Sequence, residues 1–207
     1  MSGALLTTCS RAAGASAAAA PSYTVRHAHP ADAGVMSGLI ADFAARGLML
    51  PKSPLEIVRH VRDYVVVEGR TGGVAACGGL RLYTQRIAEV VALAVDPALH
   101  GRGFGAVIVR RLLVDAEALG VEAVFAMALH PGFFHRLGFR TTDLDRIPEK
   151  VAADCRSCAR RESCREVAVG YALQPSGEEL LPVRSDPASS PAPVPRPGSL
   201  EVLWTSR

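Results

Sequence analysis

The sequence predicts an α/β domain of mixed α+β character, with a mixed sheet and helices on both of its faces. Three observations carry this prediction. Apolar residues make up 49% of the 207-residue chain, which is enough for one sizeable core. Strand-like and helix-like patterns follow one another in the order βααβββαβαβ. Hairpin-like strands come first and strand–helix–strand units follow, a combination typical of a mixed sheet.

The first half of the domain alternates short strands with two helices. The expected elements are a strand at 23–27, helices at 30–46 and 54–62, and strands at 64–68, 74–83 and 87–95. An apolar stripe marks the first helix and consists of Val35, Leu39, Ile40 and Phe43. The second helix begins with Ser53 as N-cap, Pro54 at the first helical position and Glu56 in an acidic first turn.

The second half reads as two strand–helix units and a closing strand. The expected elements are a helix at 105–119, a strand at 121–128, a short helix at 131–137 and a strand at 167–173. The folded domain is therefore expected at 22–173. An Ala/Ser-rich segment at 1–21 and a Pro/Ser-rich tail at 174–207 are predicted to be disordered, because neither can pack a core.

Composition excludes several classes of partner. The net charge is +3 and no segment forms a basic block, so nucleic acid is not expected as a main partner. No run of about 18 apolar residues occurs, so no membrane-spanning helix and no membrane partner are expected. The chain has five cysteines and no recognisable secretory signal, which favours a cytoplasmic location.

The turn after strand 87–95 is typical of an anion-binding site. Gly101, Gly103 and Gly105 alternate there and open a helix. Glycine lets a ligand approach the backbone closely, and the unpaired N–H groups of a helix start attract an anion such as a pyrophosphate. A Walker motif is excluded because no Lys-Ser/Thr pair follows, and the dinucleotide fingerprint is at best marginal because Ala106 and Ile108 stand where glycine is expected.

Two motifs resemble those of the GCN5-related N-acetyltransferases (GNAT). The segment His100–Gly105 is similar to the family's acetyl-CoA loop, with His100 at the usual Gln/Arg place, and Phe133–Phe139 resembles a later F-Y-x-x-x-G-F segment. The resemblance covers about 23–173. It implies the GNAT acyl-CoA N-acyltransferase fold, a single catalytic domain and acetyl-CoA as co-substrate.

Further segments resemble the bacterial N-acetylglutamate synthases. The matching segments are Gly47–Ser53, Glu89–Pro97 and Asp143–Val151, and the cysteine-containing run 154–166 resembles the short form of that enzyme, which lacks a kinase domain. The resemblance implies acetyl transfer to the α-amine of L-glutamate or glutamine, the first step of arginine biosynthesis. The expected partner is thus a small-molecule amino-acid acceptor, and a homodimer is left open.

The resemblance also assigns the cofactor-binding residues. Backbone N–H groups of the turn would hold the pyrophosphate of acetyl-CoA, with a charge-assisted contact from Arg102. The turn consists of His100, Gly101, Arg102, Gly103, Phe104, Gly105 and Ala106. The main chain of Leu93 and Val95 would hold the pantetheine arm. The N–H group near Val95 would stabilise the oxyanion of the transition state, which makes Val95 a catalytic residue.

The candidate catalytic base and the candidate acceptor-binding residues each have two interpretations. Glu89, on the central strand, is either the base that deprotonates the acceptor amine or a surface carboxylate paired with an arginine. Lys52 and Arg86 match basic positions of the family and would bind the acceptor carboxylates, with Arg81 as a further option; otherwise they are exposed cations.

The acid that protonates the leaving thiolate is left unassigned. Phe134 stands where the family often has a tyrosine, so a tyrosine acid is excluded at that position. His130 and His135 are alternatives that fit a structural or solvent-facing role better.

Three cysteines cluster late in the chain. Cys155, Cys158 and Cys164 would form a structural metal site, a redox pair or a set of free thiols. Cys77 lies in an apolar strand and is expected in the core.

Two other functions compete with glutamate acetylation. One is acetylation of a different amine, such as a protein N-terminus or an antibiotic. The other is a non-catalytic acetyl-CoA sensor that uses the cysteines for metal or redox regulation.

Overall fold

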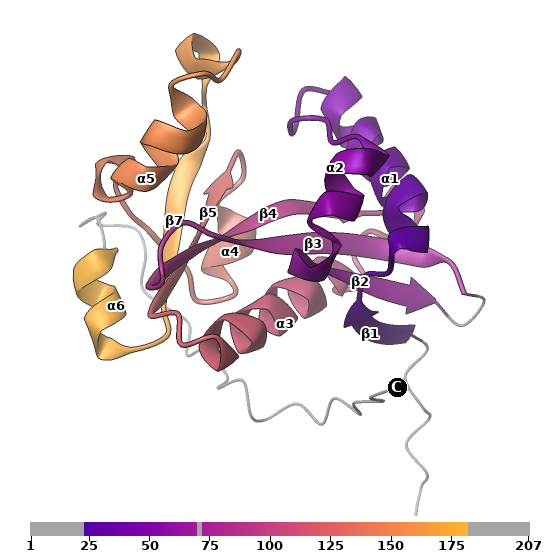
Figure 1. Cartoon of the computed structure of the whole chain (residues 1–207), viewed down its shortest axis with the longest axis horizontal. Helices are drawn as coiled ribbons and strands as arrows, with labels where there is room; N and C mark the ends of the chain where they lie inside the picture. Colours follow the sequence, from indigo (N-terminus) through magenta and orange to yellow (C-terminus); the bar gives the residue numbers. More distant parts are fainter. Residues whose placement is uncertain (1–22, 70–71, 182–207) are drawn as a thin grey trace, which may run out of the picture.

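The computed structural model describes residues 23–69 and 72–181 (Figure 1). The predicted segment 1–21 and most of the predicted tail 174–207 lie outside these residues. The strands are β1 (Tyr23–His27), β2 (Tyr64–Gly69), β3 (Val74–Leu82), β4 (Ile87–Val95), β5 (Ala123–Ala128), β6 (Arg140–Thr141) and β7 (Val167–Ala172). The α-helices are α1 (Ala33–Ala45), α2 (Pro54–Arg59), α3 (Phe104–Ala118), α4 (Gly132–His135), α5 (Pro148–Lys150) and α6 (Pro175–Leu180).

The mixed sheet predicted from the sequence is confirmed. Its seven strands lie in the order β1-β2-β3-β4-β5-β7-β6. Neighbouring strands are antiparallel except β4 and β5, which run parallel because α3 connects them as a crossover. The sheet therefore joins an antiparallel meander, β1 to β4, to a second antiparallel unit, β5 to β7.

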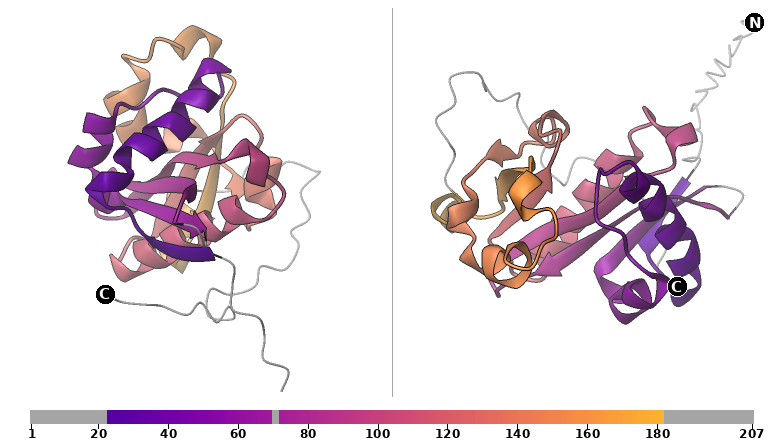
Figure 2. Two further views of the ribbon diagram at one scale, coloured as in Figure 1. Left: turned by 90° about the vertical axis from the view of Figure 1, so that its right-hand side faces the viewer. Right: turned by 90° about the horizontal axis from the view of Figure 1, so that it is seen from above.

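Helices cover both faces of the sheet (Figures 1 and 2). On one face α3 packs into the main core, where Ile108 and Leu112 are buried. Gly78 on β3 makes this approach feasible, because a Cβ atom there would lie 2.6 Å from Cγ2 of Ile108. The opposite face carries α1 and α2, and, further along the sheet, the segment 144–166 that contains α5.

The buried stripe of α1 differs from the predicted one. Met36 and Ile40 are fully buried, and Leu39 and Phe43 are partly buried against them, but Val35 is 52% exposed. The first turn from Pro30 to Asp32 is a tighter 3₁₀ turn. The α-helix thus begins at Ala33. Met36 and Ile40 are four residues apart and share the buried face of this helix, whereas Val35 is turned about 100° away from Met36.

The structure describes residues beyond the predicted boundary at Leu173. Pro175 occupies the start of α6, a position in which proline favours a helix. Leu181 is buried, and it fills the space beside Gly170 on β7, where a Cβ atom would lie only 3.0 Å away. The proline-rich composition therefore led to a boundary that is too early.

No helix within the described residues has the length and apolar character needed to span a membrane.

Candidate active site

A gap opens between the two parallel strands in the middle of the sheet. Only Ile87, Ala88 and Glu89 of β4 pair with β5, although β4 continues to Val95. Beyond that point β5 pairs only with β7 among the described residues. Ala92 has a φ of 52°, and the register of β3 and β4 shifts there, so a bulge redirects β4 where the strands separate.

The backbone of β4 turns polar groups toward this gap. The Asp96 N–H donates to Ala75 on the β3 side (2.9 Å). Successive residues of a strand face opposite ways, so the main-chain groups of Val95 and Leu93 face the β5 side. The Val95 carbonyl oxygen already accepts a bond from Nε2 of His100 (3.0 Å). The Leu93 and Val95 backbones thus line the edge predicted to hold the pantetheine arm.

The Gly-rich turn forms the start of α3, as predicted. Gly101 and Gly103 have φ values of 77° and 81°, which only glycine adopts without strain. The first intrahelical bond runs from the Val107 N–H to the Gly103 carbonyl (3.1 Å), so the N–H groups of Phe104, Gly105 and Ala106 precede the helical ladder. This 15-residue helix offers a backbone cradle for a pyrophosphate.

Side chains fix this turn between two neighbouring elements. His100 stacks on Phe43 of α1 with ring centroids 6.0 Å apart. Phe133 of α4 approaches Gly105 so closely that a Cβ atom added to Gly105 would lie 3.3 Å from the Phe133 ring. The guanidinium of Arg102 is exposed beside the cradle. The residues predicted to bind acetyl-CoA therefore lie together, at the end of β4 and the start of α3.

Glu89 lies on the opposite face of the sheet from α3, in a cluster of charged side chains. Its side chain is 4% exposed, and its Oε2 accepts bonds from Nζ of Lys150 (2.9 Å) and the hydroxyl of Tyr83 (2.8 Å). Lys150 also contacts Asp154 (2.9 Å), which Tyr83 and Arg81 bind as well. Glu89 is thus a buried carboxylate with a lysine partner, rather than a surface carboxylate paired with an arginine.

Burial sets the protonation behaviour of this cluster. Burial raises the pKa of Glu89, and the neighbouring Lys150 and Tyr83 lower it only in part. Burial also keeps the pKa of the Tyr83 hydroxyl far above its usual range, assisted by the charge of Glu89. Burial opposes the charge on Lys150, but the two carboxylates outweigh it and raise its pKa. Glu89 is therefore a stronger base than a surface glutamate.

Lys52 lies in the loop between α1 and α2, which stands on the same face of the sheet as Glu89. The Ser37 hydroxyl donates to the Lys52 carbonyl (2.8 Å) and fixes the loop backbone. The Lys52 side chain forms no ion pair with any described residue. Arg160, from the cysteine-containing segment, donates to the Gly47 carbonyl in the same loop. The α1–α2 loop and segment 144–166 thus meet over this face.

Arg86 occupies a different place from Lys52. It lies just before β4, at the end away from the Gly-rich turn, where its guanidinium binds both oxygens of Glu122 (2.7 and 2.9 Å). Glu122 also accepts a bond from the hydroxyl of Ser176 in α6. The structure therefore does not bring Arg86 next to the α1–α2 loop.

The residues considered for the thiolate acid differ in their surroundings. Phe134 is buried and packs edge-on against Phe139 (5.2 Å between centroids). His135 contacts the Thr141 hydroxyl through Nε2 (3.1 Å), whereas His130 is exposed.

The metal interpretation of the late cysteines is not supported. Among residues 23–69 and 72–181, no group of three or more His, Cys, Asp or Glu side chains could hold a metal ion. Cys155 ends a π-helical turn, and Cys164 follows the 3₁₀ turn Arg161–Ser163. All three are free. Cys77 is fully buried, as predicted, and burial raises the pKa of its thiol to about 12.

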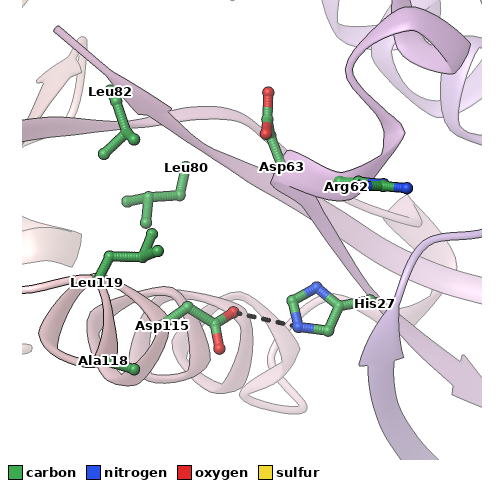
Figure 3. Close-up of a pocket in the computed structure, with 8 residues that line it drawn as sticks. All are labelled: His27, Arg62, Asp63, Leu80, Leu82, Asp115, Ala118 and Leu119. Carbon is green, nitrogen blue, oxygen red and sulfur yellow. Dashed lines mark ion pairs between the residues drawn. The ribbon is translucent and has the colours of Figure 1, made fainter.

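A separate pocket of about 300 Å³ lies near the other end of α3 (Figure 3). Its lining includes Leu80, Asp115 and Leu119, and His27 approaches Asp115 at 3.8 Å. The lining helix residues lie about 20 Å along α3 from its first turn, at 1.5 Å per residue. This pocket is therefore distinct from the Gly-rich cradle.

Sequence reasoning missed the partners of Glu89. Lys150 and Asp154 lie four residues apart on a late segment, Lys150 is 61 positions after Glu89, and no local pattern links that segment to Tyr83 and Glu89. One signal was available: Lys52 and Lys150 are the only lysines among 23 basic residues. The structure places both on the same face of the sheet.

Comparisons with known proteins agree with this geometry. The model of the acetyltransferase (GNAT) family matches residues 43–139. An uncharacterised N-acetyltransferase of Chlorobaculum tepidum, CT2212, is 34% identical over 145 residues, which are 70% of this chain and 93% of that protein. The amino-acid acetyltransferase of Mycobacterium tuberculosis is 32% identical over 150 residues, 72% of this chain and 81% of that protein. The chain spans about a third of the amino-acid acetyltransferase of Neisseria meningitidis, which it also matches.

A solved structure shows the same fold with a ligand of the expected class. Rv2747 of Mycobacterium tuberculosis, in complex with CoA and NLQ, superposes with a TM-score of 0.65 at 25% identity, over 72% of this chain and 99% of that one. The separated strands and the cradle at the start of α3 suit the pantetheine arm and pyrophosphate of such a ligand. The chain therefore belongs to the GNAT acetyltransferase family and is an N-acetyltransferase that uses acetyl-CoA.

Proposed function

We propose that this enzyme transfers the acetyl group of acetyl-CoA to the α-amine of L-glutamate or L-glutamine, the first step of arginine biosynthesis. The observation that carries the proposal is the match to the amino-acid acetyltransferase of Mycobacterium tuberculosis, of which this chain covers 81%. The acceptor class of the Chlorobaculum tepidum relative is unassigned, so that relative favours no other amine.

The proposed reaction is a direct transfer. The pyrophosphate rests on the N–H groups from Gly101 to Ala106, and the pantetheine arm runs along Leu93 and Val95. Glu89 takes a proton from the acceptor ammonium group, and the free amine then attacks the thioester carbon. The C–N bond forms and the C–S bond breaks, so that CoA leaves as a thiolate, and the second proton of the nitrogen is released to solvent. The Val95 N–H stabilises the oxyanion formed between these steps.

The acceptor carboxylates need cations on the same side of the sheet. Lys52 suits this role because its ammonium group forms no ion pair with the described residues and its backbone is anchored to α1. Arg86 does not suit this role, because it binds Glu122 at the end of β4 away from the Gly-rich turn. Arg81 is the second candidate, since its exposed guanidinium lies beside the Glu89 cluster.

An acceptor panel tests the substrate. Acetyl-CoA is offered with L-glutamate, L-glutamine, other amino acids and a short peptide with a free N-terminus, and CoA release is measured. We expect glutamate or glutamine to give the highest kcat/KM. Faster turnover of the peptide would replace the proposal with N-terminal acetylation, and tight CoA binding without turnover of any amine would favour a sensor.

Lys52→Ala tests the site. We expect the KM for the acceptor to rise about tenfold or more, because loss of a charge-assisted hydrogen bond costs about 1.5–3 kcal/mol. The KM for acetyl-CoA should stay unchanged, and Lys52→Arg should retain most of the affinity. An unchanged acceptor KM in Lys52→Ala would remove Lys52 from the acceptor site.

A further inference from the structure

The two oxygens of the Glu89 carboxylate have different surroundings. Lys150 donates to Oε2 at 2.9 Å, and the Tyr83 hydroxyl, which shares its single proton between Oε2 and Asp154, lies 2.8 Å from Oε2. No donor among the described residues reaches Oε1. No buried side-chain oxygen of the described residues is fully enclosed without a partner, so Oε1 retains a small opening. One oxygen is thus held by two donors and the other is available.

Lys150 compensates the negative charge of the buried Glu89 carboxylate, which would otherwise be lost by protonation. The Glu89 side chain is 4% exposed and that of Lys150 is 14% exposed. A buried carboxylate without a cation neutralises itself by taking up a proton, and a protonated carboxyl group cannot act as a base. Lys150 supplies the opposite charge within contact distance. It leaves enough of the burial effect that Glu89 remains a good proton acceptor.

Tyr83 fixes the direction of the carboxylate. Its ring lies against Phe125 at 5.6 Å between centroids, on the strand paired with β4, and its hydroxyl reaches Oε2. Lys150 approaches Oε2 from α5, on the other chain segment covering this face. Donors from two directions on one oxygen restrict rotation of the carboxylate, so Oε1 keeps one orientation.

We propose that Lys150 and Tyr83 are positioning residues that clamp Oε2 of Glu89, hold its carboxylate ionised, and leave Oε1 as the atom that takes the proton from the acceptor ammonium group. The inference rests on the proposed role of Glu89 as the base. It adds which oxygen reacts and which side chains prepare it. The proton passes from the acceptor nitrogen to Oε1, and the clamping bonds to Oε2 stay in place.

Other titratable groups face the clamp and must be considered. Asp154 shares both Lys150 and Tyr83 with Glu89, and Arg81 binds Asp154 from β3. The Cys155 thiol lies close enough to Lys150 for the lysine charge to act on it. Arg81 remains when Lys150 is removed, but it contacts Asp154 and the Tyr83 ring and forms no ion pair with Glu89. Of the described residues, Lys150 is therefore the only cation bound directly to Glu89.

The pH dependence of kcat/KM tests the clamp. Lys150→Met removes the cation at similar length, whereas Lys150→Arg retains it. Because Lys150 lowers the pKa of Glu89, its removal should move the acid limb of the profile to higher pH by about one to three units. Lys150→Arg should lie near the wild type. Rates are measured at saturating acetyl-CoA, with CoA affinity as a measure of intact folding.

Tyr83→Phe keeps the ring packing and removes one donor. We expect a smaller shift of the acid limb in the same direction and a lower kcat, with unchanged affinity for CoA. If Lys150→Met does not fold, the pH profile of Tyr83→Phe alone tests the clamp. Matched controls are Arg146→Met, an exposed cation on the same segment, and Tyr171→Phe, which contacts Phe139 away from the cluster; neither should move the limb.

The outcomes separate the clamp from the proposed function. An acid limb that stays in place in both Lys150→Met and Tyr83→Phe, while Glu89→Gln loses activity, overturns the clamp alone. A Glu89→Gln variant with the wild-type rate overturns both the base and the clamp. If the acceptor panel identifies an amine other than glutamate or glutamine, the substrate proposal fails, and the pH profiles are measured with that amine.

Discussion

The chemistry of Glu89 follows from the face of β4 on which it lies. Ala88 and Val90, its neighbours, point into the core under α3, so the period of two residues sends Glu89 to the opposite face. There it meets charged side chains from other segments instead of apolar ones. A register shift of one residue would place the carboxylate in the apolar core.

The core under α3 leaves no room for a side chain at Gly78. Gly78→Ala would place a Cβ atom 2.6 Å from Cγ2 of Ile108 and 3.3 Å from Cδ1 of Leu93. We expect the free energy of unfolding to fall by about 1–3 kcal/mol, the usual cost of overpacking. Chemical denaturation measures this. The double variant with Ile108→Ala should be more stable than the sum of the two single changes predicts; strict additivity would contradict the contact.

Asp32 gives the protein a pH-dependent contribution to stability. The Arg26 guanidinium holds the pKa of Asp32 below its usual value of 3.8, with help from the His29 N–H. A depressed folded-state pKa means that the unfolded state binds the proton more readily, so this stability is present above about pH 4 and lost as the pH falls below it.

We therefore expect Asp32→Asn to be about 1–2 kcal/mol less stable than the wild type at pH 7, because a charge-assisted contact is lost. The difference should shrink below pH 4. Thermal unfolding between pH 3 and 7 measures it, with Asp42→Asn on the exposed side of α1 as control. A difference that does not change with pH would show that the charge of Asp32 is not what stabilises the fold.

At the scale of elements, α3 depends on its first turn. Gly103 immediately precedes the helix with a φ of 81°, and the N–H groups of this turn, which have no intrahelical partner, are the proposed contacts of acetyl-CoA. Gly103→Ala should therefore cost about 1–2 kcal/mol of stability and weaken binding of acetyl-CoA together with it.

Gly38→Ala is the matched control for this change. Gly38 lies inside α1, and nothing lies within 4 Å of a Cβ atom added there, so alanine should stabilise the helix by up to about 1 kcal/mol. Thermal unfolding and CoA titration measure both variants. Equal CoA affinity in Gly103→Ala and the wild type would contradict the role of this turn as the cradle.

Some helices and strands could be predicted from the sequence more readily than others. The start of α3 could be predicted because strand, glycines and helix adjoin in the chain, and so could β2 to β4. Segment 144–166 could not, because its short turns have no period and its burial depends on Ile147 meeting Phe125 of β5. For the same reason the sequence could single out Glu89 on its strand as a candidate base, but it could not identify Lys150, which is 61 positions away, as the partner of Glu89.

At the scale of the whole molecule, Arg160 and the Gly47 carbonyl link two segments that stand on the same face of the sheet (Figure 1). Arg160→Ala should release the cysteine-containing segment from the α1–α2 loop. We expect faster proteolytic cleavage within 156–165 and a several-fold higher KM for the acceptor, with an unchanged KM for acetyl-CoA. Arg161→Ala, an exposed neighbour, is the control. Equal cleavage rates in both variants would show that the link has no such effect.

The short pairing between β4 and β5 has a consequence for cooperativity. Within the sheet, three residue pairs join the β1–β4 half to the β5–β7 half, and α3 and side-chain contacts such as that between Lys150 and Glu89 connect them elsewhere. A pantetheine arm lying along Leu93 and Val95 would act as an added strand between the halves. Amide hydrogen exchange in 91–95 should therefore slow on CoA binding, and the two halves should unfold more nearly as one unit. The bound co-substrate would then stabilise the connection between the two halves of the sheet as well as supply the acetyl group.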